Sequence, residues 1–149
     1  MSISQTATSS FKTQLLQAVH NFGPTLPNAF KIALYTASAD LGTSTTAYSI
    51  NNEVSGTGYT AGGNTLTISV FPTIGDNNSS VPTAYISFGN SQWTNATFTC
   101  RGALIYNDTV AGKPSVAVLD FGADKAVNND TFNVIFPTPN ANNAIVRIS

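Results

Sequence analysis

From residue 30 onward the chain repeats one arrangement, in which short strand-like runs alternate with clusters of Gly, Asn, Asp and Pro. The clearest run is Thr65–Phe71, where polar and apolar residues alternate as in a strand with one buried face. The other runs are Phe30–Thr36, Ala84–Phe88, Ala96–Thr99, Gly102–Tyr106, Ser115–Phe121, Thr131–Phe136 and Ala144–Ile148. The clusters between them have the composition of turns. We therefore predict an all-β fold, a single jelly-roll-like β-sandwich.

One segment near the N-terminus carries a helical pattern instead. Its apolar positions are Phe11, Leu15, Val19 and Phe22. Spacings of three and four residues place them on one helix face, and Gly23-Pro24 ends the pattern. We predict a short α-helix over residues 10–22 within a single domain over residues 10–149. The polar residues 1–9 are expected to form a flexible arm.

Charge is scarce in this chain, at 9% of the 149 residues and a formal net charge of −1. Asn, Ser and Thr supply 51 residues, so amides and hydroxyls make up most of the polar surface. The six Lys and Arg residues are scattered, which argues against a nucleic-acid partner. A surface with so few charges is poorly soluble as a monomer. We therefore expect an assembly that includes copies of the chain itself, as a dimer or a trimer.

No apolar run approaches the roughly 18 residues that cross a bilayer, so no membrane partner is expected. The first ten residues lack the features of a secretory signal, and synthesis in a reducing cytosol is the expectation. Cys100 is the only cysteine and is expected to be a small buried strand residue.

The residues that usually carry catalysis are few. His20 is the only histidine, and a structural role near the end of the predicted helix is favoured over a catalytic base. The glycine-rich stretch from Gly56 to Gly63 lacks the strand-then-helix context of a phosphate loop. We predict no catalytic residue, no cofactor and no metal, so that the protein is not an enzyme. A calcium site in the loops at residues 76–80 or 128–130 is the alternative left open.

Three stretches resemble a group of tailed-bacteriophage virion proteins. The first is Phe11–Phe22 followed by the strand FKIALYT at residues 30–36. The second and most specific runs from Thr45 to Thr67 and contains NEVSGTGYTAGGNTLT. The third runs from Trp93 to Asn107 and continues at Leu119–Gly122. The resemblance implies a non-enzymatic head decoration (cement) protein, made in the host bacterial cytoplasm, that sits on the outer capsid of the virion.

In such a protein the partner would be the major capsid protein, whose neighbouring subunits it clamps. The candidate contact residues are Ser2, Ile3, Ser4 and Gln5 of the arm and Glu53, Gly56, Gly58 and Tyr59 of the glycine-rich segment. The alternative for the second group is that Glu53 and Tyr59 pin a long loop to the sandwich. The alternative function is a tail, neck or baseplate component that binds a host receptor or glycan, with Trp93 and tyrosines as stacking surfaces.

Overall fold

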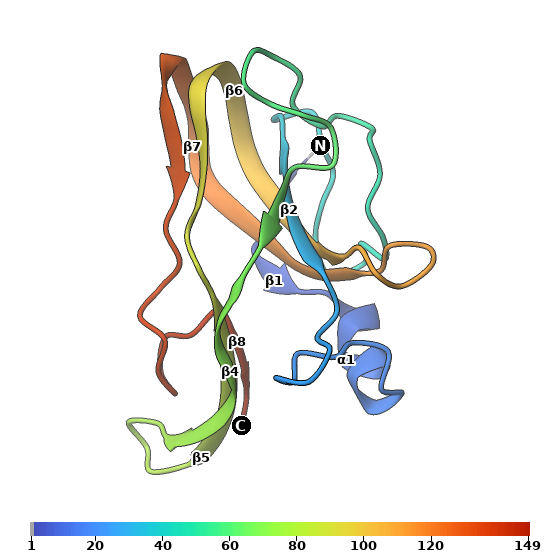
Figure 1. Ribbon diagram of the computed structural model, residues 1–149, viewed down its shortest axis with the longest axis vertical. Coiled ribbons are helices and arrows are strands. Elements are labelled where there is room, and N and C mark those ends of the chain that lie inside the picture. The colour runs from blue at the N-terminus through green and yellow to red at the C-terminus, as the bar shows by residue number, and fades with distance from the viewer. Residues whose placement is uncertain (1) are drawn as a thin grey trace.

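The computed structural model describes residues 2–149 and consists of two antiparallel β-sheets and one helix (Figure 1). The elements are β1 (Thr6–Ala7), α1 (Ser9–Leu16), β2 (Phe30–Tyr35), β3 (Asn64–Leu66), β4 (Ile68–Asp76), β5 (Pro82–Phe88), β6 (Ser91–Asn107), β7 (Ser115–Val134) and β8 (Val146–Ile148). One sheet has the order β1-β7-β6-β2-β3 and the other β4-β5-β8. The predicted all-β sandwich with a short N-terminal helix is confirmed, and its jelly-roll connectivity stays a prediction.

A long hairpin of β6 and β7 forms the spine of the larger sheet (Figure 1). Tyr106 pairs with Ser115 beside the turn, and Ser91 pairs with Val134 at the open end. The sequence predicts four short strands here, and they prove to be two long ones. The interruptions that suggested separate strands are bulges, as at Asn129, whose φ is 48° and where the register between β6 and β7 shifts.

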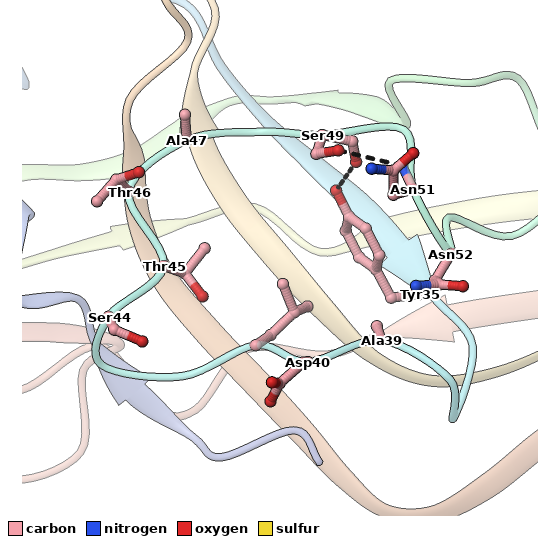
Figure 2. Close-up of a pocket in the computed structure, with 11 residues that line it drawn as sticks. Tyr35, Ala39, Asp40, Ser44, Thr45, Thr46, Ala47, Ser49, Asn51 and Asn52 are labelled. Atoms are coloured by element: carbon pink, nitrogen blue, oxygen red, sulfur yellow. Dashed lines mark hydrogen bonds between the residues drawn. The ribbon is translucent and has the colours of Figure 1, made fainter. Parts of the chain in front are cut away.

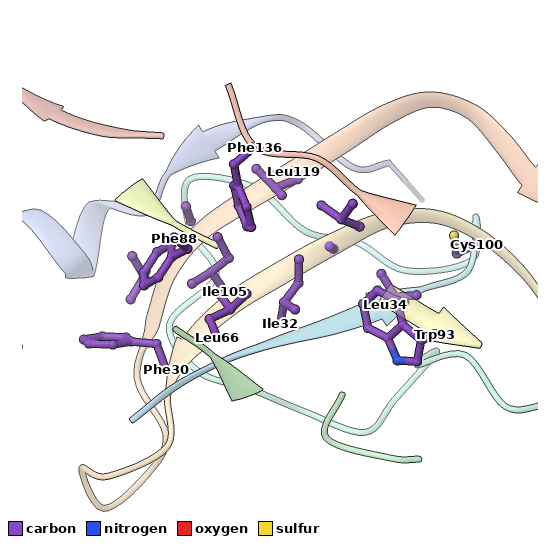
Figure 3. Close-up of a cluster of buried hydrophobic side chains, with 14 of the residues drawn as sticks. Phe30, Ile32, Leu34, Leu66, Phe88, Trp93, Cys100, Ile105, Leu119 and Phe136 are labelled. Atoms are coloured by element: carbon purple, nitrogen blue, oxygen red, sulfur yellow. The ribbon is translucent and has the colours of Figure 1, made fainter. Parts of the chain in front are cut away.

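The main core lies between the two sheets (Figure 3). Side chains alternate along β2, so that Ile32 and Leu34 enter this core while Ala33 and Tyr35 face the other side of the sheet. Both faces of β2 are buried, because a second, smaller cluster covers its outer side. The members of the second cluster are Ile3, Ala33, Tyr35, Ala39, Leu104, Tyr106 and Val118.

Helix α1 ends at Leu16, six residues before the predicted end. Ala18 adopts a left-handed conformation with φ 58°, and the Val19 N–H donates to the Gln14 carbonyl at 3.0 Å. This is a Schellman ending, which turns the chain out of the helix. Phe22 still reaches the core, because the following loop carries it back to stack on Phe30. Within residues 2–149, no helix is long and apolar enough to cross a membrane.

Candidate contact surface

The outer face of the larger sheet is covered by two segments, residues 2–8 and a loop over residues 36–63 (the 36–63 loop). The first of them lies along the sheet. Ile3 forms a parallel bridge with Leu41, the Ser4 N–H donates to the Leu41 carbonyl, and β1 pairs with β7. Residues 2–8, expected to be a flexible arm, therefore pack as part of the sandwich. Met1 lies outside the described residues.

Ile3 anchors this N-terminal segment by filling a space left by a glycine. A Cβ on Gly102 of β6 would lie 2.9 Å from Cγ2 of Ile3, too close for a real contact. Ile3 is buried as a result, while Ser2, Ser4 and Gln5 stay exposed. Of the four predicted contact residues in this segment, three can meet a partner and Ile3 holds the segment in place.

Glu53 lies at the centre of a hydrogen-bond network that fixes the 36–63 loop. Its Oε1 accepts from the Tyr59 hydroxyl at 2.6 Å and from the Gly62 N–H at 2.7 Å, while Oε2 accepts from the Tyr48 hydroxyl at 2.7 Å. The Tyr59 oxygen in turn accepts from the Leu34 N–H of β2 at 2.9 Å. Burial, followed by the bond to Glu53, raises the pKa of Tyr59 well above its ordinary value. These contacts favour the interpretation that Glu53 and Tyr59 pin the loop.

Tyrosines from other strands extend this network. The Tyr106 hydroxyl donates to the Gly62 carbonyl at 2.7 Å, and its ring stacks on Tyr48 with centroids 4.7 Å apart. Lys113 lies over the Tyr48 ring and pairs with Asp108 at 3.0 Å. Although burial opposes ionisation of Asp108, Lys113 and Lys31 hold its pKa below the ordinary value. The sequence offered no signal for Tyr106, which lies 53 positions from Glu53.

The glycines of this loop are required by contacts within the chain. A Cβ on Gly56 would lie 2.4 Å from the Thr97 carbonyl oxygen, and one on Gly58 would lie 2.9 Å from Cα of Ala96. Gly56 and Gly58 are candidate capsid contacts because a glycine-rich backbone can approach a partner closely. The structure instead brings their backbone against β6, with Thr57 and Thr97 forming a bridge.

Beside this network the loop encloses a polar cleft of about 360 Å³ (Figure 2). Asp40, Thr45 and Asn52 are among the side chains that line it, and Tyr35 forms part of its wall. The Tyr35 hydroxyl donates to the Ser49 carbonyl at 2.6 Å, so its proton is already used in a hydrogen bond to the loop. Asp40 is the only charged residue among the lining residues, so the cleft offers mainly hydroxyl and amide hydrogen-bonding groups.

A second cleft of about 310 Å³ adjoins the first and joins the N-terminal segment to the 36–63 loop. Ser2 and Ser4 line one side, and Asp40, Thr43 and Ser44 line the other. Residues 40, 41 and 44 belong to both clefts. The two clefts therefore form one continuous polar surface, to which residues 2–4 and the 36–63 loop both contribute. We call it the polar surface.

The remaining candidate residues of the sequence are buried in structural roles. Trp93 is 3% exposed and packs against Tyr59 and Phe132, so it is not available as a stacking surface. Burial, with Asp124 adding to it, raises the pKa of the Cys100 thiol to about 12. Cys100 is thus a buried strand residue, as predicted.

His20 lies beyond the end of α1, buried among aromatic rings. Its Nε2 is 2.9 Å from Oε1 of Gln14 and its Nδ1 is 3.1 Å from Nδ2 of Asn107. Because the Asn107 amide nitrogen can only donate, Nδ1 accepts and Nε2 carries the proton. Burial lowers the pKa of His20 to about 4. The imidazole is therefore neutral at pH 7 and has the structural role that the sequence favours, without the charge that would interact with a helix end.

Two carboxylates of β7, Asp120 and Asp124, are paired with an arginine of β6. Arg101 contacts Asp124 at 3.4 Å and Asp120 at 3.9 Å. Within residues 2–149, no three His, Cys, Asp or Glu side chains are grouped as metal ligands. Comparison with protein-family models, with curated proteins and with solved structures returns no match for this chain.

Proposed function

We propose that the protein is a non-enzymatic structural component of a tailed-phage virion that decorates the outer capsid and clamps neighbouring major capsid protein subunits. The observation that carries the proposal is the polar surface. Ser2 and Ser4, which the sequence predicts as capsid contacts, line it beside residues 40–44 of the 36–63 loop. A contact made by either segment would therefore involve both. The other predicted contacts, Glu53, Gly56, Gly58 and Tyr59, line neither cleft.

The chemistry of the polar surface suits a capsid contact. Ser2, Ser4, Thr43 and Ser44 offer hydroxyls and Asp40 offers one carboxylate, so the surface can form many hydrogen bonds at little cost in buried charge. The Glu53 network behind it keeps the loop in one conformation, which lowers the entropy lost on binding. Many copies, each bound only to the assembled shell, would stabilise that shell by linkage.

Electron cryo-microscopy of the virion whose genome encodes this chain tests the proposal. Density for the sandwich at symmetric positions over the shell, with the polar surface against the capsid protein, is the expected result. Density confined to a tail, neck or baseplate, or absence from the particle, would overturn it.

Binding of purified protein to undecorated capsids refines the test. Ser44→Arg places a bulky charge on the polar surface and should abolish binding while the fold is kept. Asn133→Arg, at an exposed position of β7 that lines neither cleft of the polar surface, serves as the matched control and should bind normally.

A tail or baseplate component that binds host glycans is the second candidate. The cleft of about 360 Å³ favours it, because Asp40, Asn51 and Asn52 can hydrogen-bond to sugar hydroxyls. A glycan array probed with wild-type protein and with Asn51→Ala tests this function. Signals for defined glycans that the substitution removes would support it, and an empty array would count against it.

A further inference from the structure

The smaller sheet extends beyond the core at one end of the molecule. Ile74, Ala84 and Ile148 are direct partners across β4, β5 and β8, and direct partners share a face. Ile86, two residues along β5 from Ala84, is on the same face and is buried in the main core. The face that forms the core therefore continues into solvent, where Ile74 is 71% and Ile148 is 56% exposed.

The opposite face of this sheet is covered by the protein itself. A Cβ on Gly75 of β4 would lie 3.5 Å from Cβ of Ala141, and both Ala141 and Ala144 are buried. Only one face of the extension is therefore unpartnered. Among residues 2–149, six of the eight exposed large apolar side chains lie on α1, on the loop after it, or on the β4–β5 hairpin and β8. Figure 1 places these elements at the same end of the molecule.

A groove of about 440 Å³ runs between α1 and β8 at this end (the α1 groove). Its walls include Phe11 and Leu15 of α1 and Val146 of β8. It adjoins a smaller cavity of about 150 Å³ between α1 and the face of the sheet, also lined by Leu15 and Val146. Leu16 of α1 is 92% exposed.

One cation, Lys12 of α1, lines the α1 groove. Arg147 alternates with Val146 and Ile148 along β8, so its side chain lies on the opposite face of the sheet, where it donates to the Asn142 carbonyl. Asp76 projects from the end of β4, on the same face as Ile74. Within residues 2–149, none of the three charged residues belongs to an ion pair, namely Lys12, Arg147 and Asp76. The groove thus presents apolar walls with positive charge. The end of the β4–β5 hairpin presents an exposed apolar side chain and a negative charge.

We propose that two copies of the chain associate through these surfaces, with the β4–β5 hairpin of each copy seated in the α1 groove of the other. The two surfaces are complementary in polarity, with Ile74 against the apolar walls, and in charge, with Asp76 against Lys12. Because each copy carries both surfaces, the contact can be reciprocal and close as a dimer with twofold symmetry. The inference names a surface for the self-association that the low charge of the sequence predicts, whereas capsid binding is assigned to the polar surface.

Sedimentation of the purified protein over a concentration series, with no capsid present, tests this dimer. Wild-type protein should reach a dimer. Ile74→Ser should raise the dissociation constant on the order of 100-fold, since the apolar contact is lost twice per dimer. Ile135→Ser is the matched control, because Ile135 is 75% exposed on a different segment, and it should leave the dimer intact.

A charge exchange gives the test its specificity. Lys12→Glu and Asp76→Lys should each weaken the dimer several-fold, and the double variant should recover much of the loss. A monomer at all concentrations, as expected if the groove serves another protein, would overturn the inference. A dimer whose dissociation constant is unchanged by Ile74→Ser would also overturn it. The same holds for a double charge variant whose loss of affinity equals the sum of the two single losses. Because capsid binding is measured separately, failure here leaves the proposed capsid contact standing.

Discussion

The Tyr59 hydroxyl donates to Glu53 at 2.6 Å while accepting from the backbone of Leu34 at 2.9 Å. The side chain thereby connects the 36–63 loop to β2, an inner strand of the larger sheet. Because its oxygen already receives the Leu34 proton, its own proton points to the carboxylate. The direction of this chain of hydrogen bonds requires an acceptor at position 53.

Replacing Glu53 by Gln should therefore destabilise the protein by about 1–3 kcal/mol, because an amide supplies one acceptor oxygen to three donors. Urea unfolding followed by fluorescence measures the change. Asp40→Asn is the matched control, an exposed carboxylate of the same loop, and should change stability by less than about 0.5 kcal/mol. A Glu53→Gln protein of unchanged stability that no longer binds capsids would instead favour a direct contact role.

Gly63→Ala should cost about 3 kcal/mol or more and could prevent folding. The φ of Gly63 is 74°, and an added Cβ would overlap the Ile32 carbonyl oxygen, far inside their van der Waals contact distance. Gly112→Ala isolates the backbone contribution, because φ is 82° there and nothing lies within 4 Å of the added carbon. It should cost only about 1–2 kcal/mol. Equal losses of stability in the two variants would contradict the close packing at Gly63.

Ala18→Gly should stabilise the protein by about 1 kcal/mol. Ala18 ends α1 in the left-handed conformation that glycine adopts without steric cost. Thermal unfolding would show a higher midpoint. Ala126→Gly, at an exposed position within β7, should act in the opposite direction because glycine weakens a strand interior. A lower midpoint for Ala18→Gly would mean that the Schellman ending is not formed.

Stability should fall as the pH drops from 6.5 toward 4, because of His20. Burial lowers the pKa of this residue to about 4, whereas in the unfolded chain it is about 6.5. In this range the unfolded state binds a proton that the folded state excludes. The contribution of neutral His20 to the free energy of unfolding is complete above pH 6.5, and it decreases by about 2 kcal/mol by pH 5. Since His20 is the only histidine, an NMR titration reports its pKa directly, and a midpoint near 6.5 would refute the prediction.

The architecture was largely predictable because it depends on local periodicity. The pattern around Ile32 and Leu34 correctly marked a strand and its inward side chains. The helix was predicted too long because Phe22 reaches the same core from a loop, which imitates helical spacing. Local patterns cannot show how distant segments meet.

The polar surface illustrates the same limit. The position of Ile3 depends on the missing side chain of Gly102, and the Glu53 network depends on Tyr106. Both relationships appear only when the chain is folded. The sequence therefore identified segments that contribute to the surface, but not the role of each residue within it.

The pairing of β1 with β7 has a consequence for the order of folding. Thr8 and Ser115 are hydrogen-bonded although they are 107 positions apart, and Thr6 pairs with Val118. During synthesis the N-terminal segment leaves the ribosome long before its partner strand exists. It therefore has no β7 to pair with until most of the chain has been translated. Because the pairing of β1 with β7 joins segments far apart in sequence, it should make folding slow. A nascent chain stopped before β7 would leave Ile3 and the edge of β6 that pairs with β7 open to other chains, so chaperone dependence should be greatest at that stage.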